Sequence, residues 1–290
     1  MIRLAAATYP LDWFADWSAY EAKLTDWIAQ AAGHGAQILL FPEYGAMELA
    51  SIADVDAADL SAATRAVSEA LPRATKILSG LARAHGVHIL APSGPVFEGG
   101  RLVNRAALLT PTGGVAHQDK QIMTPWEVAP WDVAGNGPLT LFETALGRIA
   151  VLICYDCEFP LLARQLTEAG ADLLLIPSAT ETVAGYSRVR IGAMARALEG
   201  QCFTAMASLT GRYPLEAVDV NHGAAGIFCP PDTGLPEDGI IASATLDEPC
   251  WCYGDLDLSL LDTARRGGGV RTRADWPLSA DRAVTRMRLA

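Results

Sequence analysis

Short apolar runs alternate along this chain with longer segments in which apolar residues recur every three or four positions. The recurring segments predict amphipathic helices that pack one face against a core. One of them spans residues 17–31 and ends at Gly33, a common helix terminator. A second, alanine-rich segment spans residues 57–84, and Pro72 predicts an interruption within it.

The short apolar runs are rich in β-favouring residues and predict buried strands. Gly-Gly and Pro-Thr-Gly-Gly segments between neighbouring runs mark hairpin turns. The predicted strands are residues 2–8, 37–41, 87–91, 101–110, 115–118, 139–143, 148–153, 172–176, 202–207, 225–229, 240–244 and 251–255. Two further helices are predicted at residues 161–169 and 185–199.

Helices and strands interleave throughout the chain, and no composition shift or linker divides it. The pattern therefore predicts one α/β domain over residues 1–290, with helices packed outside stacked sheets. Residues 265–290 contain three glycines and several arginines and are expected to form a less regular C-terminal tail.

The composition narrows the function classes. A hydrophobic content of 51% with 19% charged residues fits a folded domain with a large core, and the net charge of −11 argues against nucleic acid or an anionic membrane as partner. The chain lacks a signal peptide and a bilayer-spanning apolar run, so we expect a soluble, cytoplasmic protein. Six cysteines in such a protein do not imply disulfides.

The strand predicted at residues 148–153 delivers Cys154 to its carboxyl end, and Pro160 suits the first turn of the next helix. Open α/β sheets bind ligands at the carboxyl ends of their strands. A helix N-terminus also lowers the pKa of a nearby thiol. We therefore expect a reactive thiol at Cys154; the alternative is a small residue that fills the core.

Two other reactive side chains follow predicted strands. Glu43 comes shortly after residues 37–41, and Lys120 opens an irregular segment of twenty residues, a length typical of functional loops. Amide hydrolysis through a thioester needs these three types: a thiolate that attacks, a carboxylate that carries the proton and a cation that stabilises the oxyanion. A dyad of Cys154 with His34, His117 or His222 stays open on the sequence alone.

Three short segments resemble the signatures of the nitrilase (carbon–nitrogen hydrolase) superfamily. They are Phe-Pro-Glu at residues 41–43, His-Gln-Asp-Lys at residues 117–120 and Ile-Cys-Tyr-Asp-Cys-Glu-Phe-Pro at residues 153–160. Their order and spacing are compatible with the family over nearly the whole chain. Residues 171–178 and 196–199 are similar to further segments of the family.

The resemblance implies an α-β-β-α sandwich, usually a homodimer, with a Glu-Lys-Cys triad and neither metal nor organic cofactor. Carried over by position, Cys154 is the nucleophile, Glu43 the general base and acid, and Lys120 the oxyanion stabiliser. The backbone N–H of Tyr155 is the second oxyanion donor. Glu127, seven residues after the lysine, is expected to orient Lys120 and the substrate.

The same motif favours an amide substrate. Tyr155-Asp156 follows the nucleophile as in the amide-cleaving branches, whereas nitrile-cleaving members carry Trp-Glu there. We expect a small carboxamide to be hydrolysed to ammonia and a carboxylic acid, with N-carbamoyl compounds and nitriles as alternatives. The absence of a basic residue after Cys157 leaves the substrate class open. Tyr44, Trp126, Trp131 and Ser178 are candidates for the wall of the substrate pocket.

Three alternative hypotheses place the chain outside the hydrolases. Cys154 and Cys157 form a C-x-x-C that could serve redox chemistry, although its place in mid-chain is unfavourable. A zinc site needs a second cysteine pair, and the spacing of Cys250 and Cys252 is unsuitable. The chain could also be an inactive relative that serves as an interaction protein.

Overall fold

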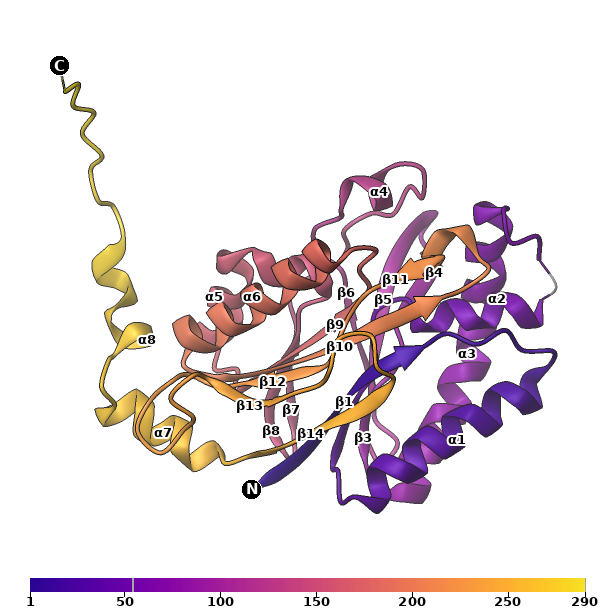
Figure 1. Ribbon diagram of the computed structural model, residues 1–290, viewed down its shortest axis with the longest axis horizontal. Helices are drawn as coiled ribbons and strands as arrows, with labels where there is room; N and C mark the ends of the chain where they lie inside the picture. The colour runs from indigo at the N-terminus through magenta and orange to yellow at the C-terminus, as the bar shows by residue number, and fades with distance from the viewer. Residues whose placement is uncertain (54, 290) are drawn as a thin grey trace.

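The computed structural model describes residues 1–53 and 55–289. Figure 1 shows two groups of helices on opposite sides of the molecule, with the strands between them. Helices α1 and α3 cover one side, and α5 and α6 cover the other. The molecule is thus a mixed α/β structure with a curled sheet between helical layers, as the sequence predicts.

The first half of the chain builds one helical layer and the strands beneath it. Its elements are β1 (Ile2–Pro10), α1 (Trp17–Gly33), β2 (Ile38–Leu40), the 3₁₀ helix η1 (Gly45–Glu48), α2 (Leu49–Ile52), α3 (Leu60–His85), β3 (His88–Leu90), β4 (Gly94–Glu98), β5 (Arg101–Leu109), β6 (Val115–Asp119), α4 (Pro125–Val128) and β7 (Leu141–Thr144).

The second half builds the other layer. Its elements are β8 (Gly147–Val151), the 3₁₀ helix η2 (Cys154–Glu158), α5 (Pro160–Glu168), β9 (Leu173–Ser178), α6 (Val183–Gly200), β10 (Phe203–Arg212), the 3₁₀ helix η3 (Glu216–Val218), β11 (Val220–Asn221), β12 (Gly226–Phe228), β13 (Ile240–Ser243), β14 (Cys250–Leu256), α7 (Leu258–Gly267), α8 (Thr272–Asp275) and the 3₁₀ helix η4 (Trp276–Ser279).

Strand β1 joins the two halves. The strand order is β4-β5-β3-β2-β1-β10-β9-β8-β7, and β14 pairs antiparallel with β1. Along β1, Leu4 and Ala6 face the core shared with β8, β9 and β10, whereas Ala5 and Ala7 face the core under α1 and α3. Because β1 is buried on both faces, its alternate residues pack into two different cores, one on each face of the sheet.

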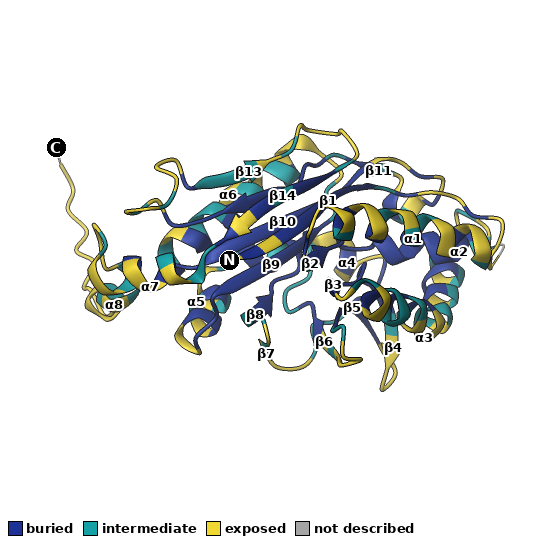
Figure 2. Cartoon of the chain, turned by 90° about the horizontal axis from the view of Figure 1, so that it is seen from below, coloured by how far each residue is buried: buried dark blue, intermediate teal, exposed yellow. Residues whose placement is uncertain are grey.

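Figure 2 shows the result of this packing: the central strands are buried, and the helices expose only their outer faces. Each long helix begins at a residue whose side chain accepts a backbone hydrogen bond. Asp16 accepts from the Ala19 N–H, Asp59 from the Ala62 N–H, and Thr182 from the Gly185 N–H. Such caps satisfy donors that the first helical turn leaves free.

The structure corrects three expectations from the sequence. Helix α3 runs through Pro72 without a break, because its buried face, which includes Val67 and Leu78, stays packed while Pro72 lies exposed. Strand β4 was not predicted, since its sequence holds a proline and only one buried pair of residues. Helix α7 was not predicted either; it begins before the tail at residues 265–290 and buries Leu261 and Ala264.

Within the described chain, no helix is both long enough and apolar enough to cross a bilayer. The expected homodimer stays a prediction.

Candidate active site

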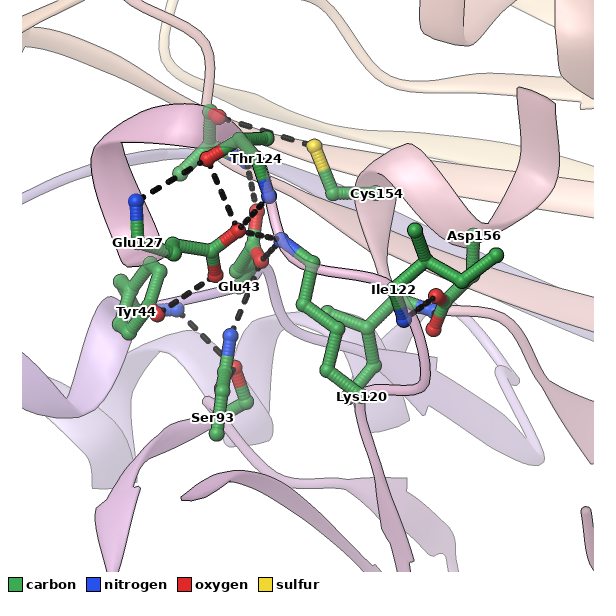
Figure 3. A network of polar contacts seen from close by, with 12 residues as sticks. Glu43, Tyr44, Ser93, Lys120, Ile122, Thr124, Glu127, Cys154 and Asp156 are labelled. Atoms are coloured by element: carbon green, nitrogen blue, oxygen red, sulfur yellow. Dashed lines mark hydrogen bonds and ion pairs between the residues drawn. The ribbon is translucent and has the colours of Figure 1, made fainter. Parts of the chain in front are cut away.

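The three reactive side chains predicted from the sequence meet at one end of the stacked sheets. Glu43 follows β2, Lys120 follows β6 directly, and Cys154 opens η2 after β8. All three are buried, with Glu43 and Lys120 each 1% exposed. Figure 3 shows the Lys120 amine reaching the carboxylates of Glu43 and Glu127, with the Cys154 sulfur on the same side of the network.

Lys120 makes two short contacts that hold its ammonium group in place. Its Nζ donates to Glu43 Oε1 at 2.7 Å and to Glu127 Oε2 at 2.6 Å. Burial alone would lower the pKa of Lys120, but the two carboxylates outweigh burial and raise the pKa well above its ordinary value. Lys120 is therefore a fixed positive charge. The neighbouring Asp119 does not compete for it, because that carboxylate pairs with Arg105 at 2.6 Å.

Glu127 is held by the short helix α4. Thr124 and Glu127 form a capping box, in which the Thr124 N–H donates to Glu127 Oε2 at 2.9 Å. The Tyr44 hydroxyl donates to the other oxygen of Glu127 at 2.7 Å. Although burial opposes it, Lys120 lowers the pKa of Glu127. Glu127 thus stays ionised and contacts the Lys120 ammonium group.

For Glu43, burial and the neighbouring charges shift the pKa in the opposite direction. Burial raises its pKa more than Lys120 lowers it, and the nearby charge of Glu127 adds to the rise. Its Oε1 accepts from Asn104 Nδ2 at 2.9 Å and its Oε2 from the Ala179 N–H at 3.0 Å. A carboxylate with a raised pKa, fixed on both oxygens, is suited to take up and return a proton.

The pKa of Cys154 is raised, whereas the sequence predicted that a helix N-terminus would lower it. Burial and the adjacent Glu43 raise the pKa of the thiol well above its ordinary value. The Cys154 side chain is thus a neutral thiol that lies beside Glu43.

The backbone at Cys154 is strained. Its φ is +49°, in the left-handed region that residues other than glycine rarely adopt. Its Sγ lies 3.7 Å from the Ala179 carbonyl oxygen. Left-handed conformations of non-glycine residues cluster at active sites, where surrounding structure holds a side chain in a required direction. The strain therefore supports Cys154 as a functional residue.

Two residues of this network escaped sequence analysis. Asn104 lies within β5 and is completely buried, and its amide joins Glu43 to Ser93. Ala179 follows β9 and contacts both Glu43 and Cys154 through its backbone, so its side chain carries no signal. A polar residue inside an apolar strand, such as Asn104, is the one feature that could have been noticed.

Asp156 connects the cysteine turn to the lysine loop. Its carboxylate accepts the N–H groups of Gln121 at 3.2 Å, Ile122 at 2.8 Å and Ile153 at 3.2 Å. Burial raises the pKa of Asp156 to about 7, against the lowering effects of Lys120 and of these donors. One side chain therefore fixes the residues adjacent to both Lys120 and Cys154.

We expect Asp156→Ala to lower kcat about 100-fold, the scale of a small displacement of catalytic groups, with a smaller effect on KM. Asp156→Asn keeps one acceptor oxygen and should lose less. Steady-state kinetics of ammonia release, with thermal melting as a check on folding, measure the effect. Asp119→Asn is the control, since Asp119 is also next to Lys120 but pairs with Arg105. Equal losses in both variants would contradict a specific role for Asp156.

A cavity of about 310 Å³ opens above the network. Glu43, Lys120, Glu127 and Cys154 line its inner part, and residues 216–221 form the opposite wall.

The aromatic candidates for the pocket wall lie where the sequence suggested. Tyr44, Trp126 and Trp131 line the cavity, and the rings of Tyr44 and Trp131 meet edge to face at 4.7 Å. The indole N–H of Trp131 is buried without a partner in the described residues and is available to a ligand. Ser178 does not line the cavity: it is buried in β9, where its hydroxyl donates to the Ala207 carbonyl.

The backbone of Tyr155 directly follows the nucleophile, at the expected place for an oxyanion donor. Its ring is partly buried against Phe159, at 4.8 Å between centroids. The histidine alternative finds no support, because His34, His117 and His222 are all absent from the cavity wall.

The two cysteines of the C-x-x-C point to different partners. Cys157 Sγ lies 3.6 Å from the Val189 carbonyl, under helix α6, whereas Cys154 faces Ala179. All six cysteines are free thiols. Among residues 1–53 and 55–289, no group of three or more histidine, cysteine or acidic side chains could hold a metal ion.

A buried thiol, a carboxylate with a raised pKa and a fixed ammonium in one cavity are the groups of a hydrolase that acts through a cysteine. The comparison with known families agrees with this class. The chain belongs to the carbon-nitrogen hydrolase family, whose model matches residues 3–264, and thus to the nitrilase superfamily.

Individual relatives are hydrolases and amidases. The chain is 30% identical to the "Probable hydrolase YhcX" of Bacillus subtilis (strain 168) over 94% of its own length and 53% of that protein, so it spans about half of this relative. It is 25% identical to "Omega-amidase NIT2" of Danio rerio, over 82% of the chain and 83% of that protein.

A solved structure with the same fold is a mutant of the amidase from Nesterenkonia sp. AN1, in which acrylamide has added to the active-site cysteine. The TM-score is 0.69 at 25% identity, covering 91% of this chain and 97% of that chain. The chain therefore belongs to the carbon-nitrogen hydrolase family and has amidase-like neighbours.

Proposed function

We propose that this hydrolase cleaves small carboxamides through a thioester on Cys154, releasing ammonia and a carboxylic acid. The observation that carries the proposal is the buried network in which Lys120 contacts Glu43 while Glu43 faces the thiol of Cys154. Amide chemistry needs a base for the thiol, an acid for the leaving amine and a cation for the oxyanion, and this network supplies all three.

In the proposed first half-reaction, Glu43 takes the proton of Cys154 as the sulfur attacks the amide carbon. Lys120 and the Tyr155 N–H stabilise the oxyanion of the tetrahedral intermediate. Glu43 then gives its proton to the nitrogen, the C–N bond breaks, and ammonia leaves a thioester. In the second half-reaction, Glu43 takes a proton from water, the hydroxide attacks the thioester, and the proton returns to the sulfur as the acid departs.

The raised pKa of Glu43 supports this proton path, whereas the raised pKa of the Cys154 thiol works against it. A neutral thiol next to an ionised carboxylate with an elevated pKa makes the proton transfer less costly than it would be to an ordinary glutamate. Glu127, with its lowered pKa, is not a competing base, because its charge is committed to Lys120.

The test uses a panel of short carboxamides, their matching nitriles and N-carbamoyl compounds. We expect the amides to yield ammonia and acid in equal amounts. Mass spectrometry of enzyme quenched during turnover should find an acyl adduct on the peptide that carries Cys154. Efficient turnover of a nitrile while the matching amide is inert would reject the amide substrate and leave the triad intact.

A further inference from the structure

The cavity carries an excess of negative charge. Five carboxyl groups line it, and Lys120 is the single cationic side chain among the described residues of its wall. Lys120 is already paired with Glu43 and Glu127. Three carboxylates therefore remain without a cation inside the cavity. They are Glu181, Glu216 and Asp219.

These three side chains are at the mouth. Glu181 follows β9, Glu216 opens η3, and Asp219 comes directly after η3, and all three residues are exposed. None of them forms an ion pair with another residue of the described chain. Their negative charges are thus not neutralised by a neighbouring cation. A molecule that enters the cavity passes these carboxylates before it reaches Cys154.

The rest of the mouth is aromatic. Trp126 lines the cavity with half of its surface exposed (50%), and Tyr44 and Trp131 continue the wall toward the thiol. The face of an indole ring attracts an ammonium or guanidinium group, most strongly when water is excluded. Carboxylates and an exposed indole around one opening together favour a cation and repel an anion.

We propose that the cavity selects carboxamides whose acyl part ends in a positive charge and rejects those that end in a carboxylate. This inference rests on the proposed function. The amide carbon lies at Cys154, and the cationic end lies among Glu181, Glu216 and Asp219 near Trp126. An anionic end at the same place would add a negative charge where no cation is free to pair with it.

The first experiment compares three amides of equal length. They are 5-aminopentanamide, hexanamide and the monoamide of adipic acid, which end in an ammonium, a methyl and a carboxylate group. We expect kcat/KM to fall in that order, with at least about tenfold between the first and the last, equivalent to ~1.4 kcal/mol. The ratio should shrink in 1 M salt, where the Debye length is about 3 Å.

Neutralising the mouth should remove the preference. In a triple variant with Glu181→Gln, Glu216→Gln and Asp219→Asn, the ratio of kcat/KM between the cationic and the anionic amide should approach one. The matched control carries Glu21→Gln, Asp26→Asn and Glu69→Gln on the exposed faces of α1 and α3, and so has the same net charge. An unchanged ratio in the mouth variant, or an equal change in both triple variants, overturns the inference.

A second readout separates this inference from the proposed function. Methanethiosulfonates that carry a trimethylammonium or a sulfonate group label thiols without any turnover. Relative to their rates with a free thiol, we expect the cationic reagent to label Cys154 at least about tenfold faster, with the Cys154→Ala variant as background.

Two outcomes then have distinct meanings. Labelling that prefers the cation while no amide is hydrolysed overturns the proposed function but supports the charge selection of the cavity. Amide hydrolysis that is as fast with the adipic monoamide as with 5-aminopentanamide supports the proposed function and overturns the charge selection.

Discussion

Replacing Cys154 with alanine is expected to abolish amide turnover, with a loss of about 10⁶-fold in kcat, the scale found when a hydrolase loses its nucleophile. The thiol is the one group in the cavity that can form the thioester, and neither Glu43 nor Lys120 can substitute for it. Ammonia release per mole of folded enzyme measures the loss, and mass spectrometry should show no acyl adduct on any peptide.

Cys157 is the matched control, three residues further along the same turn. Its sulfur is buried beneath α6, close to Gly192, and Cys157 is not part of the cavity wall. Cys157→Ala should therefore retain most of the activity and lose only some stability, since a small void forms in the core. Activity that vanishes in the Cys157 variant and persists in the Cys154 variant would reverse the assignment of the nucleophile.

Glu43→Gln is expected to lower kcat/KM by about 10²–10⁴-fold, the contribution typical of a general acid–base group. Glutamine has nearly the same shape, and its one amide oxygen can accept from either Lys120 or the Ala179 N–H, but it cannot accept the proton of Cys154. Both the formation and the hydrolysis of the thioester should slow, so a rapid burst of ammonia followed by a stalled acyl-enzyme would contradict a role of Glu43 in the first step.

Glu48→Gln tests whether the loss of any buried carboxylate has the same effect. Glu48 is fully buried and pairs with Lys23, much as Glu43 pairs with Lys120, but it is not part of the cavity wall. We expect the Glu48 variant to be less stable and to keep its rate per folded molecule. If Glu48→Gln lowered the rate as much as Glu43→Gln does, the loss in the Glu43 variant would reflect impaired folding and not a catalytic role.

The same base sets the pH dependence. Glu43 must be ionised to accept the thiol proton, and its pKa is raised. The value of kcat/KM should thus fall as pH drops through a midpoint above the ordinary glutamate value of about 4.3. Asp156, with a pKa near 7, is a second candidate for this limb. The midpoint should persist in Asp156→Asn; its disappearance there would assign the limb to Asp156.

The elements of this fold were largely predictable because each strand and helix serves a continuous core. The apolar runs that become β1, β8 and β9 are buried on both faces and read as strands without further information. Local rules failed where tertiary packing decided the outcome. Pro72 does not break α3, because the helix is held along its whole buried face, and α7 forms because Leu261 finds a place in the core.

The sequence predicted the reactive side chains of the candidate site but not the residues that hold them in place. Glu43, Lys120 and Cys154 were identified because each follows a predicted strand and because the motifs that hold them resemble those of the nitrilase superfamily. Asn104 and Ala179 were missed, since one acts from inside a strand and the other through its backbone. Contacts of that kind leave no pattern in a linear sequence.

The sequence by itself determined which residue types are available and where the chain turns. It also determined that a thiol, a carboxylate and a lysine follow three strands. The tertiary structure alone decided their state. Sequence rules predicted a thiolate activated by a helix, whereas burial and Glu43 keep Cys154 protonated. The reason is physical: a pKa depends on solvent exclusion and on charges within a few ångströms, and these distances exist only once both sheets are stacked.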